Sequence, residues 1–425
     1  MQEKTNSAEE ERAIAEAIKA SKIEEAKNEA IKNFVGSLSP DEKFAQLFLV
    51  NIEGNEKFRS VENTKDKKPL VPGGCLLFFP NISDNAEKTF QFIKSIKDFY
   101  VQNNLVPPYI ATDQEGGDVV RLRKVTSKFL SQKEIAQNAL KTDQAVCEYY
   151  ETQAKQMALI GFNMNLAPVV EVETDFNHDF LDTRTFGNLE NVLKYGKIEI
   201  DGFEKNGIAT VLKHFPGNSS TDPHTGLPSI TYSDSEKEIY FKPFEELLKS
   251  SSAVLMSHAI VKPYGSQEKI YDSPACLSYH WVTQIVREKY GFDGLIFSDD
   301  IFMGALTDNG FPPEKAAIEA INAGINVIML SEKKFGTVSE ILQAEASKNE
   351  VFRKKIEKSV FRIIEYKIKT GILKFEEISK DSSNEDFKLK FIVKINEDFS
   401  KEFDKKQFSN AYEKGMNLIN HETER

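Results

Sequence analysis

The stretch IATVLKHFPGNSSTDPHTGLP, residues 208–228, joins a strand-like run to a polar loop. Residues 208–212 are mainly apolar and β-branched, which is typical of a buried strand, and the pattern turns polar at Lys213 and His214. The Pro, Gly, Ser and Asn residues that follow predict a loop, in which Asp222 stands two positions before His224. A carboxylate beside an imidazole raises the imidazole pKa and fixes its tautomer, which suits general acid catalysis near neutral pH. Taken alone, an Asp-x-His sequence is more often a polar surface turn, so the rest of the chain is needed to distinguish a surface turn from an acid-base pair.

Apolar runs like this one recur along the chain. They occupy residues 47–50, 75–79, 109–112, 164–170, 209–212, 253–256, 295–297 and 327–330. Helical patterns lie between most of them, for example the apolar spacing within residues 92–100, and a longer one covers 351–372. Strands without polar alternation, each followed by a helix, indicate a parallel sheet that is covered on its outer face. The sequence therefore predicts an α/β protein, a (β/α)8 TIM-type barrel with helical N- and C-terminal extensions.

Polar residues gather where these predicted strands end. They are Asp113 to Gly117 after the third run, Glu171 after the fourth, Lys213 and His214 after the fifth, Ser257 and His258 after the sixth, and Ser298 to Asp300 after the seventh. In a (β/α)8 barrel the active site lies at the C-terminal ends of the strands. A polar residue at a single strand end is usually a helix cap or a satisfied polar group, but polar residues at five equivalent strand ends predict one shared site.

Composition narrows the range of functions. The chain has 425 residues, 40% of them hydrophobic, and a formal net charge of -11, which argues against nucleic acid as a partner. No apolar run approaches the roughly 20 residues of a membrane span. The three cysteines stand at no metal-ligand spacing and are expected to be reduced. We expect a monomer that acts on a neutral or weakly charged small substrate, and a cytoplasmic location as the sequence is written. Removal of a signal peptide would instead indicate an exported or lipid-anchored protein.

The chain divides into three parts by composition. Residues 1–35 are charged and Ala-rich and predict a weakly amphipathic helix or tether, and residues 36–373 form the catalytic barrel. Residues 374–425 are a charged tail with a helix expected over 405–420. The tail is too short for an independent domain, so we expect it to pack on the barrel or fray.

The strand-end residues favour glycoside hydrolysis over other chemistries. There is no P-loop glycine motif, no Gly-x-Ser-x-Gly elbow and no His-x-x-x-His helix. Asp222, His224, His214 and His258 could bind a divalent metal, but two of them stand on a flexible loop, whereas metal ligands usually occupy rigid elements. We therefore predict no metal and no organic cofactor. Glycoside hydrolysis needs one ionised carboxylate below the anomeric carbon and one acid beside the leaving oxygen.

The carboxylate candidates are Asp299 and Asp300. Successive strand side chains point to opposite faces, so the two cannot both reach one sugar. Strand alternation alone does not choose between them, and Asp300 could equally cap the segment that begins at Ile301.

The motifs together resemble glycoside hydrolase family 3, in its β-N-acetylglucosaminidase branch, over residues 38–373. The motifs that carry the resemblance are Asp113-Gln-Glu-Gly-Gly, Thr183-Arg-Thr-Phe-Gly, Lys213-His-Phe-Pro-Gly, Asp222-Pro-His and Phe297-Ser-Asp-Asp. By that resemblance Asp299 is the nucleophile, and His224, supported by Asp222, is the general acid and base. Those implied to bind the substrate are Asp113, Arg121, Arg184, Lys213, His214 and His258.

Two features depart from the branch. The loop after Gly217 is about two residues shorter and reads Asn-Ser-Ser-Thr where the branch usually has His-Gly. Asp118 stands where relatives often carry Arg, which weakens the expected grip on an acidic aglycone.

The resemblance implies a retaining exo-hydrolase that releases terminal β-linked N-acetylglucosamine (GlcNAc) from muropeptides or chitooligosaccharides, with a role in carbohydrate metabolism such as peptidoglycan recycling. A β-glucosidase or a phosphorylase of the same family is the alternative enzyme, because a neutral imidazole base tolerates an incoming phosphate better than a carboxylate does. The remaining alternative is a sugar-binding barrel without catalysis. Asp299 and the Asp222–His224 pair argue against it, because a binding protein needs no nucleophile.

Overall fold

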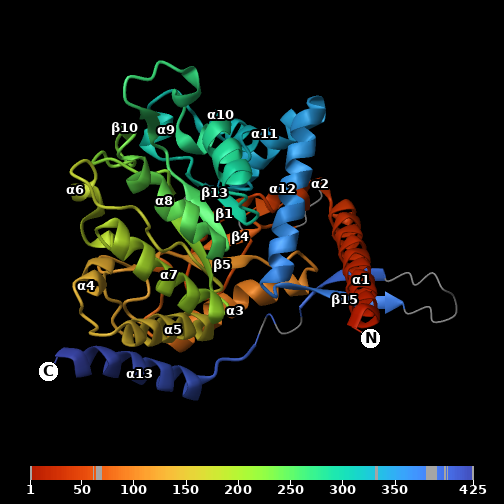
Figure 1. Cartoon of the computed structure of the whole chain (residues 1–425), viewed down its shortest axis with the longest axis horizontal. Coiled ribbons are helices and arrows are strands. Elements are labelled where there is room, and N and C mark those ends of the chain that lie inside the picture. Colours follow the sequence, from red (N-terminus) through yellow and green to blue (C-terminus); the bar gives the residue numbers. More distant parts are fainter. Residues whose placement is uncertain are drawn as a thin grey trace.

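Eight parallel strands close into a barrel at the centre of the protein (Figure 1). The computed structural model describes residues 2–60, 62–63, 69–330, 334–379, 390–396, 399 and 401–423. In order around the barrel, the strands are β1 (Phe48–Asn51), β4 (Gly74–Leu76), β5 (Tyr109–Thr112), β8 (Met164–Asn165), β9 (Ala209–Phe215), β11 (Ala253–Met256), β13 (Leu295–Asp300) and β14 (Val327–Leu330). Each strand pairs with its neighbour in the sequence, and β14 closes on β1 with Leu49 opposite Met329. The predicted fold class is confirmed.

The eight predicted apolar runs each contain a barrel strand, although some bounds differ. β9 and β13 continue into the polar residues Lys213, His214, Asp299 and Asp300, which are buried and hydrogen-bonded. β8 extends only to Asn165, although residues 167–170 still hydrogen-bond to β9. These extensions of β9 and β13 place charged side chains inside the barrel mouth.

Helices surround the barrel, as the sequence pattern predicts (Figure 1). The longer ones are α3 (Ala86–Gln102), α5 (Asp143–Ile160), α7 (Leu189–Lys205), α8 (Lys237–Leu247), a π-helical segment η6 (His280–Lys289), α10 (Pro313–Ala323), α11 (Phe335–Lys348) and α12 (Glu350–Lys369). The short ones are α2 (Pro40–Ala45), α4 (Gln132–Ala136), α6 (His178–Leu181) and α9 (Gly304–Thr307). α12 begins where the Asn349 side chain accepts the Phe352 N–H, a typical N-cap, and it buries Phe352, Ile356 and Val360.

Short paired strands lie outside the barrel. They are β2 (Glu62–Asn63) with β3 (Pro69–Leu70), β6 (Gln114–Gly116) with β7 (Val119–Val120), and β10 (Ser229–Tyr232) with β12 (Ile260–Pro263). β10 and β12 follow β9 and β11, so they build the rim above the C-terminal ends of the barrel strands.

The two extensions pack on the barrel's helices. α1 (Gln2–Ser37) contacts α12 and the hairpin of β15 (Leu373–Ser379) and β16 (Lys390–Ile395), and α13 (Lys405–Thr423) lies along α5 (Figure 1). The predicted N-terminal and C-terminal helices are thus present, and the hairpin between α12 and α13 was not predicted. Part of the predicted polar stretch 376–390 falls outside the described residues. The three-part domain division stays a prediction. In the described part of the chain, no helix is long and apolar enough to cross a bilayer.

The N-terminal end of the barrel is closed by α12. Tyr366 packs edge-on against Tyr109 of β5, with ring centroids 6.1 Å apart. The fully buried Lys367 donates from Nζ to Gln46 Oε1 at 2.6 Å, and burial lowers its pKa to about 7. This end is therefore filled by side chains, and the open end is the one where the strands terminate.

A buried carboxyl group lies behind the barrel wall, at Glu199 of α7. Its side chain is fully buried and accepts one hydrogen bond from Gln132 Nε2, at 3.4 Å. Burial raises the pKa of Glu199 from 4.5 to about 8, so the folded protein holds this group protonated at neutral pH.

The raised pKa predicts a pH-dependent stability. As pH rises from 4.5 to about 8, the unfolded chain ionises Glu199 while the folded chain keeps its proton, so the folded state loses stability. The slope is at most about 1.4 kcal/mol per pH unit. Glu199→Gln removes this slope, so the variant should have a higher Tm than wild type at pH 8 and little advantage at pH 4.5. Glu340→Gln, at an exposed position of α11, is the control and should leave the profile unchanged. An unchanged profile in Glu199→Gln would contradict the prediction.

Candidate active site

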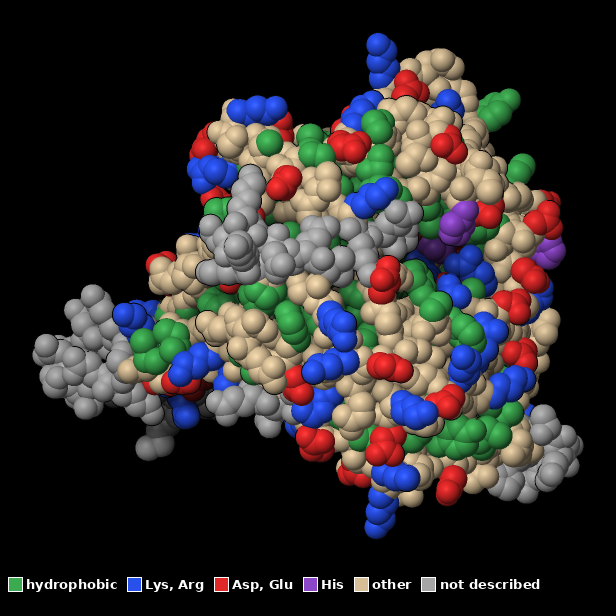
Figure 2. Space-filling view, turned by 180° about the vertical axis from the view of Figure 1, so that it is seen from behind, with side chains coloured by type: hydrophobic (Ala, Val, Ile, Leu, Met, Phe, Trp, Pro, Cys, Tyr) green, Lys and Arg blue, Asp and Glu red, His purple; other side chains and the backbone are tan. Residues whose placement is uncertain are grey.

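A pocket of about 460 Å³ opens at the C-terminal ends of the strands. Seven of the nine predicted site residues line it: Asp113, Arg121, Arg184, Lys213, His214, His224 and Asp299. Imidazole and cationic side chains gather around a hollow on the face seen in Figure 2. The structure thus brings together residues from β9 and β13, Asp113 immediately after β5, and residues of three further segments between the barrel strands, as expected for a barrel of this kind.

Glu115 organises the floor of this pocket. Its Oε2 accepts a hydrogen bond from Arg184 Nε at 2.7 Å, and its Oε1 accepts one from Arg184 Nη2 at 3.0 Å. Lys213 Nζ lies 2.6 Å from the same Oε1. Lys213 Nζ also donates to Asp113 Oδ1 at 2.7 Å. One buried carboxylate therefore fixes two cations that come from different loops and strands.

The charges of this floor stabilise one another. Burial alone would raise the pKa of Glu115, but the charges of Lys213 and Arg184 hold it well below its usual range. Burial likewise opposes the charge on Lys213, and the carboxylates of Asp113 and Glu115 outweigh it and raise the Lys213 pKa. Lys213 and Glu115 thus remain charged at neutral pH, and the floor presents fixed donors and acceptors to the pocket.

Glu171 holds the next residue of β9. Its Oε1 lies 2.7 Å from His214 Nδ1, so Nδ1 carries the proton and donates it to the carboxylate. The same carboxylate accepts the backbone N–H of Asn218 at 2.6 Å. Glu115 and Glu171 belong to the strand-end residues that were predicted to share one site, but no role was predicted for either of them. Both stand beside predicted strand ends, and the signal that could have found them is a buried acid next to a cation or an imidazole.

Asp299 and Asp300 occupy different environments at the end of β13. Asp299 Oδ1 accepts the Asp300 N–H at 2.8 Å, and Asp300 Oδ1 accepts the Phe302 N–H at 2.9 Å. Asp300 thus stabilises the turn that follows the strand, which was the alternative the sequence left open for it. Both aspartates line the pocket, and the choice of Asp299 as the nucleophile stays a prediction.

His258 does not line the pocket, which corrects its predicted role in substrate binding. The ring is fully buried, with Nε2 donating to Asp300 O at 2.9 Å and Nδ1 3.2 Å from Cys276 Sγ. Burial lowers the His258 pKa and keeps the ring neutral. Both ring nitrogens are therefore used within the protein, and His258 supports the backbone beneath the two aspartates.

The Asp222–His224 pair stands on the exposed loop above the pocket. Asp222 Oδ1 accepts both the backbone N–H of His224 at 2.9 Å and its Nδ1–H at 2.7 Å. The backbone hydrogen bond from His224 is the main reason why the Asp222 pKa lies below its ordinary value. With Nδ1 bound to the carboxylate, Nε2 is the ring nitrogen left to exchange a proton with a substrate.

The loop is docked onto the segment after β13. Ala305 N donates to Pro223 O at 3.0 Å, and a Cβ placed on Gly304 would lie 2.6 Å from His224 O. Only glycine allows the loop this close to the turn that follows the two aspartates. The imidazole and the carboxylate of Asp299 thus belong to segments that touch each other.

The walls of the pocket combine one cation with apolar side chains. Arg121 Nε is buried and finds no partner within the described residues, and its guanidinium lies 5.5 Å from the centre of the Phe78 ring. Phe180 and Phe302 line the pocket as well, and the Arg184 guanidinium lies 5.2 Å from the Phe180 ring. Aromatic faces and unpaired donors are the groups that bind a sugar ring and its substituents.

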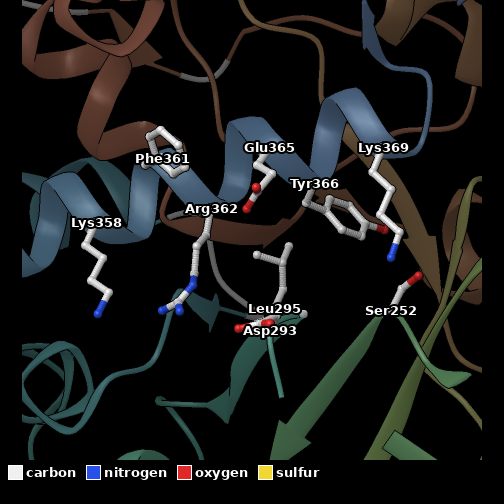
Figure 3. Close-up of a pocket in the computed structure, with 10 residues that line it drawn as sticks. Ser252, Asp293, Leu295, Lys358, Phe361, Arg362, Glu365, Tyr366 and Lys369 are labelled. Atoms are coloured by element: carbon white, nitrogen blue, oxygen red, sulfur yellow. The ribbon is translucent and has the colours of Figure 1, made fainter. Parts of the chain in front are cut away.

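A second hollow, of about 560 Å³, lies between α12 and the N-terminal ends of β11 and β13 (Figure 3). Lys358, Arg362 and Lys369 of α12 line it together with Asp293 and Glu365, and most of these charges are exposed. Strand N-termini serve stability in barrels of this type, so size alone does not make this hollow the active site. Among the described residues, no group of three or more His, Cys, Asp or Glu side chains is placed to hold a metal ion.

Comparison with known proteins agrees with this geometry. The profile described as "Glycosyl hydrolase family 3 N terminal domain" matches residues 39–366. The chain belongs to glycosyl hydrolase family 3.

Several members of family 3 are similar to this chain. A β-hexosaminidase of Tolumonas auensis is 30% identical over 280 residues, which are 64% of this chain and 79% of that protein. β-Hexosaminidase A of Pseudoalteromonas piscicida is 29% identical over 320 residues, which are 70% of this chain and 53% of that longer protein. This chain therefore spans about half the length of the second relative.

One solved family 3 structure confirms the fold. It is a β-N-acetylglucosaminidase from Paenibacillus sp. str. FPU-7, with 22% sequence identity and a TM-score of 0.69. The match covers 89% of this chain and 69% of that one. At this identity the likeness concerns the barrel architecture alone.

The ion-pair floor of this family 3 barrel predicts unequal stability effects. Lys213→Met leaves buried Glu115 with one cation fewer, and breaking a buried pair costs roughly 3–5 kcal/mol of unfolding free energy. Arg121→Met removes a cation that lines the same pocket and has no ion-pair partner in the described part of the chain, so it should cost less than about 1 kcal/mol. Urea unfolding of both variants measures the difference. Equal losses in the two variants would show that the Glu115 pairs carry no special stability.

Proposed function

We propose that this protein is a retaining exo-β-N-acetylglucosaminidase that releases terminal GlcNAc through a glycosyl-Asp299 intermediate. The proposal rests on the position of Asp299 and His224 at the same pocket. The hydrogen bond from Ala305 N to Pro223 O holds the Asp222–His224 loop against the segment that follows Asp299. The names of the relatives, β-hexosaminidase and β-N-acetylglucosaminidase, support the choice of sugar.

The first step breaks the glycosidic bond. The Asp299 carboxylate attacks the anomeric carbon, and the bond to the leaving oxygen breaks as His224 Nε2 donates its proton to that oxygen. Asp222 Oδ1 accepts the Nδ1–H of His224, so the ring is oriented with Nε2 free to face the leaving oxygen. The products are a free aglycone with a hydroxyl group and a glycosyl ester on Asp299.

The second step regenerates the enzyme. His224, now neutral, takes a proton from water at Nε2, and the water oxygen attacks the anomeric carbon. The ester bond to Asp299 breaks, and GlcNAc leaves with its β configuration retained. Two inversions at the same carbon give net retention.

The floor binds the sugar in both steps. Lys213, Asp113 and Arg184 present charged donors and an acceptor toward the pocket, and His214 presents Nε2 because Glu171 holds Nδ1. Arg121, whose Nε has no partner among the described residues, is the donor that we assign to the N-acetyl carbonyl or a neighbouring hydroxyl. We infer that muropeptides or chitooligosaccharides are the substrates, with peptidoglycan recycling by a cytoplasmic monomer as the setting.

The experiments that test the function measure the choice of substrate, the effect of phosphate, the product stereochemistry and the trapping of the intermediate. Nitrophenyl-GlcNAc should be turned over much faster than nitrophenyl-glucose, phosphate should not change the rate, and the first-formed product should be β-GlcNAc. A fluorosugar that traps the intermediate should label Asp299, and Asp299→Asn should lose several orders of magnitude in kcat while its Tm is retained. Phosphate-dependent release of a sugar phosphate would identify a phosphorylase instead. Preference for the glucoside would identify a β-glucosidase, and labelling of Asp300 would overturn the choice of nucleophile.

The assignment of His224 predicts a dependence on the leaving group. A nitrophenolate departs without a proton, whereas a sugar alkoxide needs one. His224→Ala should therefore lose roughly 10²–10⁴-fold in kcat on a GlcNAc disaccharide and much less in glycosyl-enzyme formation from nitrophenyl-GlcNAc. Asp222→Asn should act in the same direction but more weakly, and it should lower the basic-limb pKa of the rate profile. Equal losses on the two substrates in His224→Ala would leave the pair a structural feature.

A further inference from the structure

Glu171 is a buried acid, six residues after the end of β8, whose partners belong to two different parts of the site. The side chain is 4% exposed. Its Oε1 accepts His214 Nδ1 at 2.7 Å, His214 N at 3.2 Å and Asn218 Nδ2 at 3.3 Å, and its Oε2 accepts Asn218 N at 2.6 Å. A single carboxylate thus binds a residue of the pocket floor and the first residues of the catalytic loop.

We propose that Glu171 is a positioning residue that links the seating of the sugar to the placement of the general acid. The proposal rests on the function proposed above and adds a residue to which none of the known motifs assigns a role. Glu171 does not touch the reacting atoms in this assignment. It acts through His214 on one side and through Asn218 on the other.

The first link fixes the imidazole in the pocket. The carboxylate can only accept, so His214 Nδ1 must carry the proton, and Nε2 is then an acceptor in the neutral ring. The second hydrogen bond, from the His214 backbone, prevents the carboxylate from turning away. His214 therefore meets a substrate hydroxyl with one defined tautomer and one orientation.

The second link fixes the root of the loop. Asn218 stands six positions before His224 and is bound to Glu171 through both its backbone and its side chain. Gly217, immediately before it, has a φ of 133°, so the chain turns sharply between the two residues that Glu171 binds. Further along, Ser220 Oγ donates to Phe176 O at 2.7 Å and Ala305 N donates to Pro223 O. The loop is thus held at its root, its middle and beside His224, and Glu171 holds the root.

A glutamine at this position would not satisfy the same partners. All four atoms that face the carboxylate are donors, and an amide offers one acceptor oxygen and two further donors. Glu171→Gln keeps the size of the side chain but sets an N–H group against another donor. Losing a hydrogen bond to a charged partner corresponds to roughly a 10- to 100-fold effect.

Glu173 offers a matched control. It lies on the same loop, two residues after Glu171, and its Oε1 binds His178 Nδ1 at 2.8 Å. That imidazole is 55% exposed and does not line the pocket. Glu173→Gln therefore makes the same chemical change to a carboxylate–imidazole pair outside the site.

The experiment measures kcat and KM for a series of aryl GlcNAc glycosides with leaving groups of increasing pKa, and for a GlcNAc disaccharide. In Glu171→Gln, we expect kcat on the disaccharide to fall roughly 10- to 100-fold more than kcat on nitrophenyl-GlcNAc, with a steeper dependence on leaving-group pKa and a raised KM. In the His224→Ala background, the same substitution should not steepen that dependence further. Glu173→Gln should match wild type.

Two results would overturn the proposal. One is an equal loss on all substrates, with an unchanged dependence on the leaving group, which a merely structural residue would give. The other is a further steepening in the His224→Ala background, which would separate Glu171 from the acid. Should Glu171→Gln fail to fold, Glu171→Asp provides the same test, because it keeps the carboxylate but shortens its reach. A wild-type protein inactive on every GlcNAc substrate would instead refute the proposed function itself.

Discussion

The site depends on one buried carboxylate, that of Glu115. Removed from water, its charge would be costly, and it persists because Lys213 and Arg184 donate to it directly. Those two cations belong to different parts of the chain, since Lys213 lies on β9 and Arg184 lies in the loop after β8. Their spacing, and with it the shape of the pocket floor, is therefore set by the anion between them. The long polar end of β9 exists inside the barrel for the same reason.

Above this floor the site is built in a different way. Glu115 and Lys213 are almost fully buried on barrel strands and their immediate extensions, whereas the side chains of Asp222 and His224 are 53% and 68% exposed. Charges held in a packed interior have little freedom, so the floor is preorganised. In the proposed function His224 is the acid, and its exposed side chain is accessible to solvent. The hydrogen bonds of Glu171 connect the buried floor with the exposed loop, because they join the last buried residues of β9 to the first residues of the loop.

Much of this arrangement could be predicted from the sequence. Parallel barrel strands are buried on both faces, so their apolar runs are uninterrupted, and the first polar residue after each run marks the mouth. That rule located Lys213 and Asp299. It misplaced His258, two residues after the end of β11, because the ring turns into the interior and contacts Asp300 O and Cys276 Sγ, partners that are distant in sequence. The partners of Glu115 and Glu171 are distant in sequence, so their roles become visible only once the barrel closes.

The separation of the site into a buried floor and an exposed loop affects how related sequences can change during evolution. If the proposed function holds, changes in the loop of residues 217–226 would alter the surroundings of the leaving group without moving the buried charges of the floor, because Glu171, Ala305 and Phe176 hold the loop at its root, at its backbone near His224 and at one hydroxyl. Surface loops accept insertions and new side chains far more readily than barrel strands do. One sugar-binding scaffold can in this way acquire different aglycone preferences through mutations that leave its folding untouched.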